Sequence, residues 1–238
     1  MKKIDDLRVK IFADGADKTD MLEMYDKSYI KGLTTNPTLM KKAGITDYRG
    51  FCKDILTQIK DKPLSIEVFS DNFNDMERQA MEIASWGSNV YVKIPVTNTK
   101  CETSVELIKK LGVRMVKMNV TAIMTKQQIW DVVNALNPNV PSYVSVFAGR
   151  IADTGQDPIP ILAEALDLMK IAPASELIWA SPRELLNIFQ ADALGCHVIT
   201  VTNDILKKIH LIGYDLDKYS LDTVKMFYKD SLEAGFFL

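Results

Sequence analysis

Short runs of β-branched and other apolar residues alternate with longer helical patterns along the whole chain, and this alternation restricts the fold more than any other feature. Each run has four to seven residues, the length expected for a strand buried on both faces. The segments between the runs place apolar residues at i, i+3, i+4 and i+7, as in helices that pack on one face. The predicted strands are Val9–Ala13, Ile30–Thr34, Leu64–Phe69, Val90–Pro95, Met115–Thr121, Tyr143–Phe147, Leu177–Ala180 and His197–Thr202.

Eight strand–helix units in one unbroken series predict a (β/α)8 barrel. The alternative, an open doubly wound sheet, needs a glycine-rich phosphate turn after the first strand, and the segment Ala13–Asp17 is not one. At 238 residues, 47% of them hydrophobic, the chain fits a single barrel domain over residues 1–238. Residues 217–238 are predicted to form an additional helix ending in Phe-Phe-Leu, which we expect to dock on its own barrel or on a neighbouring subunit.

Capping residues give some of the helix ends. Asp71 is predicted to cap a helix over Phe73–Ser85. Gly112 and Gly195 are predicted to lie just past the ends of two other helices, where a glycine commonly follows.

Charge, cysteine and histidine content argue against several classes of function. Lys and Arg number 29 against 31 Asp and Glu, a net charge of −2, so nothing favours nucleic acid or an anionic membrane as partner. The 3 cysteines are odd in number and form no C-x-x-C pair, and the 2 histidines are too few for a three-imidazole metal site. No signal-peptide pattern occurs, and no apolar run approaches the roughly 18 residues that span a bilayer. We expect a soluble, cytoplasmic chain with no metal and no cofactor.

The fourth predicted strand carries a lysine among apolar residues. In a barrel the chemistry lies at the carboxyl ends of the strands, and period-2 alternation places Tyr91 and Lys93 on one face and Val92 and Ile94 on the other. Burial disfavours the ammonium form and lowers the pKa of a lysine, as a Schiff-base nucleophile requires. The structural alternative is a lysine that reaches water or pairs with a carboxylate.

Polar side chains at neighbouring strand ends accompany this lysine. They are costly to bury, so their number favours a functional site over packing alone. One complication is Lys117 on the fifth strand, which has the parity of Asn119 and is a second buried lysine, a counter-ion for Glu67 or a rival nucleophile. The polar strand-end residues are Asp14, Asn36, Glu67, Asn119, Thr121 and Ser145. Phe147 lies two residues after Ser145 and is predicted to face the same side of the strand.

Two arginines follow the sixth and seventh strands and predict an anion site. Arg150 follows Gly149, and Arg183 lies in a Ser-Pro-Arg segment that begins at Ser181. Guanidinium groups and a hydroxyl at adjacent loops beside a helix N-terminus suit an anionic oxygen group. The structural alternative pairs both arginines with helix carboxylates such as Glu184 or Asp157.

Two stretches carry a resemblance to a known family. Gly32–Thr38 (Gly-Leu-Thr-Thr-Asn-Pro-Thr) and Val92–Pro95 (Val-Lys-Ile-Pro) resemble the signatures of transaldolase, and the similarity runs from about Ile11 to the last helix. The resemblance implies a class I aldolase barrel with the Schiff-base lysine on the fourth strand, which favours Lys93 over Lys117. It also implies transfer of a dihydroxyacetone unit from sedoheptulose 7-phosphate or fructose 6-phosphate to glyceraldehyde 3-phosphate or erythrose 4-phosphate, in the pentose phosphate pathway.

The resemblance implies a role for each candidate residue. Asp14 looks like the acid/base acting on the C4 hydroxyl, Glu67 like the carboxylate that activates a shuttle water, and Thr121 like the hydroxyl that positions this water. The implied substrate-binding residues are Asn36, Asn119 and Ser145 for the donor hydroxyls, Phe147 for the aromatic wall, and Arg150, Ser181 and Arg183 for the phosphate.

The resemblance leaves the exact reaction and the assembly open. The short fructose 6-phosphate aldolases have glutamine and tyrosine where this chain has Glu67 and Phe147, which favours transaldolase, but the length matches the short subfamily. That subfamily often assembles through its C-terminal helix, so we expect a homo-oligomer: a decamer of two pentameric rings, a pentamer or a dimer. A ketose with a sulfonate in place of the phosphate, and a non-catalytic anion-binding barrel, also stay open. The expected partners are small sugar phosphates, not nucleic acid or membrane.

Overall fold

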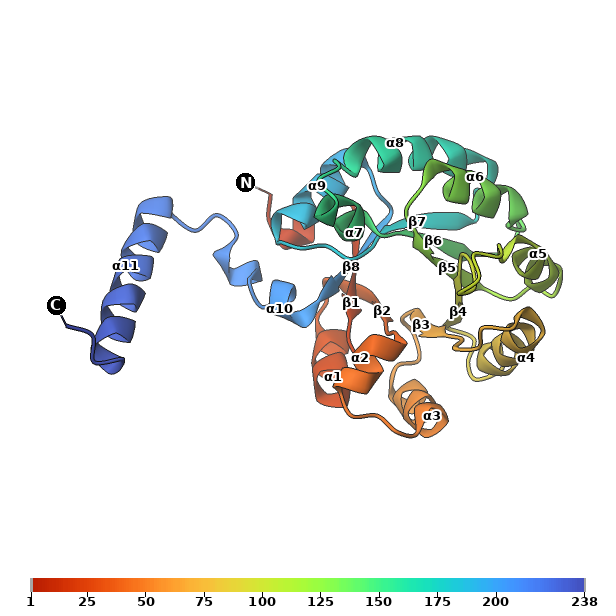
Figure 1. Ribbon diagram of the computed structural model, residues 1–238, viewed down its shortest axis with the longest axis horizontal. Coiled ribbons are helices and arrows are strands. Elements are labelled where there is room, and N and C mark those ends of the chain that lie inside the picture. The colour runs from red at the N-terminus through yellow and green to blue at the C-terminus, as the bar shows by residue number, and fades with distance from the viewer. Residues whose placement is uncertain (1, 238) are drawn as a thin grey trace.

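The computed structural model describes residues 2–237, and its eight parallel strands close into a barrel in sequence order (Figure 1). Each strand pairs with the next, and the last returns to the first, which confirms the predicted (β/α)8 barrel. The observed ends differ from the predicted ones by at most three residues. The strands are β1 Lys10–Asp14, β2 Ile30–Thr34, β3 Leu64–Glu67, β4 Val90–Pro95, β5 Met118–Ile123, β6 Ser142–Val146, β7 Ser175–Trp179 and β8 Val198–Thr202.

Helices cover the outside of the barrel (Figure 1). In chain order, the helices of the described residues are α1 Lys18–Asp26, α2 Pro37–Lys42, α3 Tyr48–Gln58, α4 Phe73–Ala84, α5 Val105–Val113, α6 Lys126–Ala135, α7 Ala148–Asp153, α8 Ile159–Leu168, α9 Leu186–Leu194, α10 Asn203–Leu206 and α11 Leu216–Glu233, with short 3-10 turns at Ile4–Asp6, Met169–Ile171 and Ile209–Leu211. The last of them, α11, does not cover the barrel (Figure 1). No helix among the described residues is long and apolar enough to cross a membrane.

Two of the predicted capping residues are wrong. Asn72 caps α4, accepting hydrogen bonds from the backbone N–H groups of its first turn, whereas the Asp71 carboxylate accepts from Thr99 in a neighbouring loop. Gly112 lies inside α5. Gly195 follows α9 with a φ of 86°, as predicted, because this left-handed conformation favours glycine.

Two apolar layers position the site. The larger one lies between the strands and the surrounding helices, and the side chains of Val92 and Ile94 belong to it. The smaller one fills the inside of the barrel with Phe12, Tyr143, Ile178, Ala180 and Val198. This inner layer forms an apolar floor below the polar side chains at the carboxyl ends of the strands.

Gly32 on β2 makes room for the centre of that floor. A Cβ atom there would lie 2.6 Å from the ring of Phe12, which is fully buried and packs edge-on against Tyr143 with ring centroids 5.5 Å apart. Gly32→Ala is therefore expected to lower the free energy of unfolding by about 1–3 kcal/mol. Urea denaturation measures this loss. Adding Phe12→Leu should recover part of it, and an equal loss in the single and double variants would contradict the packing argument.

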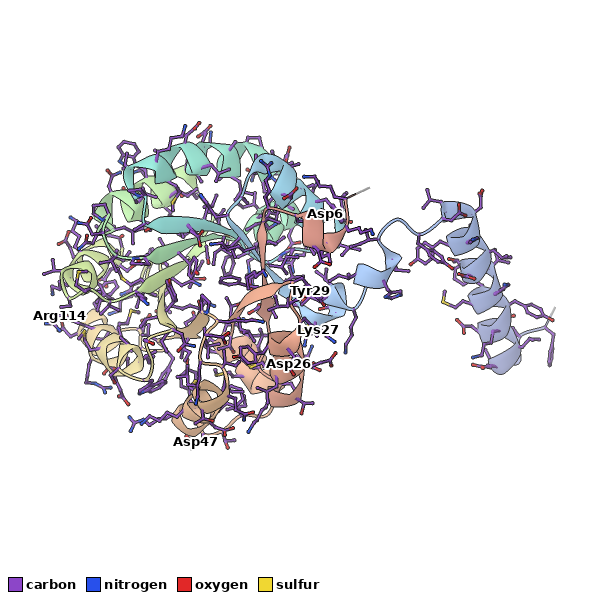
Figure 2. All side chains as sticks on the ribbon, turned by 180° about the vertical axis from the view of Figure 1, so that it is seen from behind. Asp6, Asp26, Lys27, Tyr29, Asp47 and Arg114 are labelled. Atoms are coloured by element: carbon purple, nitrogen blue, oxygen red, sulfur yellow. The ribbon has the colours of Figure 1, made fainter. Side chains whose placement is uncertain are left out.

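The C-terminal helix α11 stands apart from the barrel (Figures 1 and 2). This confirms an additional helix, which begins at Leu216 and ends at Glu233; Leu238, the last residue of the predicted segment, lies outside the described residues. None of its residues is buried, so the expectation that it docks on its own barrel is wrong. Its exposed apolar side chains are Leu216, Tyr219, Leu221, Val224, Met226, Phe227, Tyr228 and Leu232, followed by Phe236 and Phe237.

Candidate active site

Lys93 lies at the carboxyl end of β4 with its side chain only 8% exposed. Its Nζ donates a hydrogen bond of 2.9 Å to the carbonyl oxygen of Thr35 and lies 3.1 Å from Oε2 of Glu67. Glu67 reaches this position because β3 and β4 pair in register, with Glu67 opposite Lys93. The lysine is therefore inside the barrel as predicted, and it is also paired with a carboxylate.

Lys117 lies at the opposite end of the barrel. It precedes β5, and its Nζ donates a hydrogen bond of 2.8 Å to the carbonyl oxygen of Ser88, which precedes β4. The same Nζ lies 5.6 Å from the ring centroid of Tyr91. Lys117 is therefore neither a second buried lysine nor a counter-ion for Glu67, whose ion pair is with Lys93. Its position at the other end of the barrel, below the apolar floor, argues against a rival nucleophile.

Asp14 ends β1 and belongs to the same cluster as Lys93. Burial raises the pKa of its carboxyl group, and the charge of Lys93 and a hydrogen bond from Thr34 lower this pKa in part. The Thr34 hydroxyl donates to Oδ1 of Asp14 at 2.7 Å and also contacts the Thr200 hydroxyl. Neither threonine was among the sequence-predicted site residues, although both have inward parity on their strands.

Asn119 connects three strands through its amide. Its Nδ2 donates to Oγ of Ser65 at 3.0 Å, and its Oδ1 accepts from Oγ of Ser145 at 2.7 Å. All three side chains are buried. Because both ends of the amide are bonded, the orientation of Asn119 is fixed, and Ser65 is a further inward polar residue that the predicted site did not include.

Thr121 follows Asn119 at a bulge in β5. The register with β6 shifts between Val120 and Ile123, and Ala122 takes a left-handed φ of 62°. Bulges of this kind redirect a side chain. The Thr121 hydroxyl is buried and has no hydrogen-bond partner within residues 2–237. A buried polar group of this kind suits a water molecule or a substrate hydroxyl.

Asn36 lies on the loop that follows β2. Its Oδ1 accepts a hydrogen bond of 3.0 Å from the backbone N–H of Leu39, so it is the N-cap of α2. This cap holds the side chain in one orientation at the carboxyl end of the barrel. The structure therefore gives Asn36 a structural role in addition to the binding role that the sequence suggested.

The two predicted anion-binding arginines differ in their contacts. Arg183 forms a two-point ion pair with Asp153 on α7, with Nε 3.1 Å from one carboxylate oxygen and the terminal nitrogen bonded to the other. Arg183 is therefore paired with a helix carboxylate, which is the structural alternative to an anion site. The carboxylate is that of Asp153 and not that of Glu184 or Asp157. Arg150 is exposed and stacks over Phe147, with its guanidinium carbon 6.0 Å from the ring centroid.

Gly149 lets the loop of Arg183 pack against the start of α7, the helix that carries Arg150. A Cβ on Gly149 would lie 1.5 Å from the carbonyl oxygen of Ser181, so only glycine allows this approach. Ser181 itself has a left-handed φ of 59°, a conformation that costs a non-glycine residue energy and is common at ligand-binding loops. Ser181 and Arg183 thus lie directly against the start of α7, one residue from Arg150.

Within residues 2–237, no group of three or more His, Cys, Asp and Glu side chains has the arrangement of a metal site. The polar cluster at the carboxyl ends offers an amine, two carboxylates, hydroxyls and an amide. These are the groups of nucleophilic and general acid–base chemistry.

The fold and this cluster define a barrel enzyme built around a buried, carboxylate-paired lysine. A family model for transaldolase/fructose-6-phosphate aldolase matches residues 11–236, and the chain belongs to this family. It is an enzyme of the transaldolase type, a transferase.

Curated relatives agree with this assignment. A probable transaldolase of Clostridium kluyveri is 33% identical over 199 residues, covering 83% of this chain and 88% of the relative. One of Thermoanaerobacter sp. is 35% identical over 202 residues, covering 84% and 89%. A third, of Syntrophomonas wolfei, is 28% identical over 223 residues, covering 92% of this chain and 100% of the relative.

Proposed function

We propose that this enzyme transfers a three-carbon dihydroxyacetone unit from a ketose phosphate to an aldose phosphate through a Schiff base on Lys93. The donors are sedoheptulose 7-phosphate or fructose 6-phosphate, and the acceptors are glyceraldehyde 3-phosphate or erythrose 4-phosphate. The observation that carries the proposal is the buried Lys93–Glu67 pair at the carboxyl end of the barrel, with Asp14 in the same cluster. Membership of the transaldolase family supports it.

The first half-reaction begins at Lys93. Its Nζ, after transferring a proton to Glu67 directly or through water, attacks the C2 carbonyl carbon of the ketose to give a carbinolamine. Loss of water from C2 leaves an iminium, which accepts electrons. Asp14 then removes the proton of the C4 hydroxyl, the C3–C4 bond breaks, and its electron pair moves to the iminium. The aldose phosphate leaves, and a three-carbon enamine stays on Lys93.

The second half-reaction reverses these steps with a new aldehyde. The enamine carbon attacks the carbonyl carbon of the acceptor, and Asp14 returns its proton to the new C4 oxygen. Water then adds to C2 of the iminium, and the product ketose leaves Lys93. In this proposal Glu67 and Thr121 hold the water that shuttles protons, which suits a Thr121 hydroxyl that has no partner among the described residues.

Substrate recognition divides between the two ends of the site. Asn36, Asn119 and Ser145 bind the dihydroxyacetone hydroxyls, and Phe147 forms the aromatic wall. Arg150, Ser181 and Arg183 bind the phosphate. Since Arg183 is held by Asp153, a phosphate dianion must share or replace that carboxylate. Arg150 has no ion pair with any other residue of the described chain, so it meets the phosphate without giving one up.

Product analysis separates transfer from aldol cleavage and from binding alone. Fructose 6-phosphate with erythrose 4-phosphate should give sedoheptulose 7-phosphate, with little free dihydroxyacetone when erythrose 4-phosphate is left out. Rapid release of dihydroxyacetone would instead identify an aldolase. Competition between fructose 6-phosphate and a 6-sulfonated ketose tests whether the site prefers a phosphate or a sulfonate. Binding of a ketose phosphate without turnover would indicate a non-catalytic, anion-binding barrel. We propose that the reaction belongs to the pentose phosphate pathway and takes place in the cytoplasm.

We further propose that residues 1–238 form a single domain that assembles into a homo-oligomer through α11, as a decamer of two pentameric rings, a pentamer or a dimer. The support is the set of exposed apolar side chains on α11. No residue of this helix is buried against the rest of the described chain. Exposed apolar area of this extent favours association.

Charges on this helix should therefore abolish assembly. Val224 and Phe227 lie three residues apart, on one face of α11, and are 59% and 62% exposed. Val224→Asp with Phe227→Asp is expected to reduce the oligomer to monomers in sedimentation velocity, because each carboxylate would have to be buried. Lys225→Gln is the control and should leave the size unchanged. A double variant with the wild-type size, or a monomeric wild type, would contradict the proposal.

A further inference from the structure

Two buried hydroxyl groups connect β8 to Asp14. Thr200 on β8 and Thr34 on β2 flank β1 from opposite sides, and their side chains are 7% and 2% exposed. The Thr34 hydroxyl lies within hydrogen-bond distance of both the Thr200 hydroxyl and Oδ1 of Asp14. Three neighbouring strands thus contribute one continuous chain of oxygen atoms to the candidate acid/base.

The number of hydrogen atoms fixes the direction of this chain. A hydroxyl carries a single hydrogen, and a carboxylate only accepts. When Asp14 is ionised, the Thr34 hydroxyl must donate its single hydrogen to the Asp14 carboxylate. In the contact between the two threonines, Thr200 is then the donor and Thr34 the acceptor. The Thr200 hydroxyl has no other hydrogen-bond partner within residues 2–237, so its hydrogen is available for Thr34.

The electrostatic surroundings explain why such a chain matters. Burial disfavours a charged Asp14, and so does the carboxylate of Glu67, whereas Lys93 favours the charge. Lys93 is itself held by Glu67 and by the Thr35 carbonyl. During the proposed reaction its nitrogen is uncharged as the attacking amine and in the carbinolamine, while Asp14 is still a carboxylate, so its support for the Asp14 charge varies. The hydroxyl chain supplies a fixed contribution, and hydrogen bonds in such chains strengthen one another.

We propose that Thr200 is a positioning residue that keeps Asp14 in its carboxylate form by directing the Thr34 hydroxyl toward it. This inference rests on the proposed function for its catalytic meaning, because only the carboxylate can take the proton of the C4 hydroxyl. The effect of Thr200 on the protonation of Asp14 exists in the free protein as well and can be measured without substrate.

The test compares Thr200→Val, which keeps the shape and removes the hydroxyl, with Thr200→Ser, which keeps the hydroxyl. The protein is labelled with carbon-13 at the aspartate carboxyl groups, and Asp14→Asn assigns the signal of Asp14. Ser175→Ala is the matched control, because Ser175 is a buried hydroxyl on the neighbouring strand β7 outside this chain of oxygens. If Thr200→Val does not fold, Thr200→Cys, with its weakly donating thiol, replaces it.

In Thr200→Val we expect the titration midpoint of Asp14 to rise by roughly half a unit to one unit. Below the midpoint, kcat/KM for the ketose phosphate should fall by about three- to tenfold, since one unit corresponds to a factor of ten. Thr200→Ser should restore both values, and Ser175→Ala should change neither. An unchanged midpoint in the valine or cysteine variant, or a serine variant that shifts as far as valine, would overturn the inference. A shifted midpoint in a protein without transfer activity would overturn the proposed function instead.

Discussion

Replacing Lys93 with alanine is expected to lower turnover of a ketose phosphate on the order of 10⁴-fold or more, because it removes the amine that forms the iminium. Lys93 is not part of the apolar floor of the barrel, so the smaller alanine side chain leaves that floor intact. We therefore expect the variant to fold and the loss of turnover to come from the missing amine. Steady-state kinetics with fructose 6-phosphate and erythrose 4-phosphate, at saturating substrate, measures the effect on kcat.

The matched control is Lys117→Ala, which removes the lysine at the other end of the barrel. Lys117 donates its hydrogen bond to the Ser88 carbonyl, far from the polar cluster, so kcat should stay within about twofold of wild type, apart from a small loss of stability. A Lys93→Ala protein that still turns over the ketose phosphate would refute the mechanism. A Lys117→Ala protein as inactive as Lys93→Ala would return the nucleophile to the fifth strand.

Asp14→Asn is expected to lower kcat by about 10²- to 10⁴-fold, the range for loss of a general acid–base group. The amide keeps the shape but cannot take the proton from the C4 hydroxyl, so C3–C4 cleavage slows. Formation of the Schiff base at Lys93 does not require Asp14, so it should survive. Rapid-mixing measurements that separate iminium formation from cleavage would locate the slow step.

The pH profile gives a second signature of Asp14. Burial raises the pKa of its carboxyl group, and only the carboxylate is active, so activity should fall on acidification at a higher pH than for an ordinary aspartate. Asp17→Asn is the control, because asparagine caps α1 as well as aspartate does. Loss of iminium formation in Asp14→Asn, or an acid limb that persists there unchanged, would contradict the assigned role.

The barrel and the inward residues were predictable because both follow from local patterns. Alternating strand and helix segments leave few architectures, and a period of two assigns each strand residue to one face. This is why Lys93, Glu67, Asn119 and Ser145 lie inside the barrel as predicted. Strand ends were less certain: β5 begins at Met118 and not at Met115, which has a left-handed φ of 59°.

The height of a side chain along the barrel axis, and its hydrogen-bond or ion-pair partners, were not predictable from strand parity. Lys117 shares the parity of Asn119 but lies at the other end of the barrel, because a period of two gives the face and not the height. The Arg183–Asp153 pair joins the loop after β7 to the last residue of α7, and their approach depends on Gly149, a long-range contact that spacing does not encode. The role of Thr200 was not predictable, because threonine is common in strands and only the closed barrel brings its hydroxyl to Thr34.

The most direct test of the central claim is reduction with borohydride in the presence of fructose 6-phosphate, followed by peptide mass mapping. We expect a three-carbon or six-carbon adduct on the peptide that contains Lys93, and none on the peptide that contains Lys117. An adduct on another lysine, or turnover of the sugar with no adduct anywhere, would contradict the claim that Lys93 is the Schiff-base nucleophile.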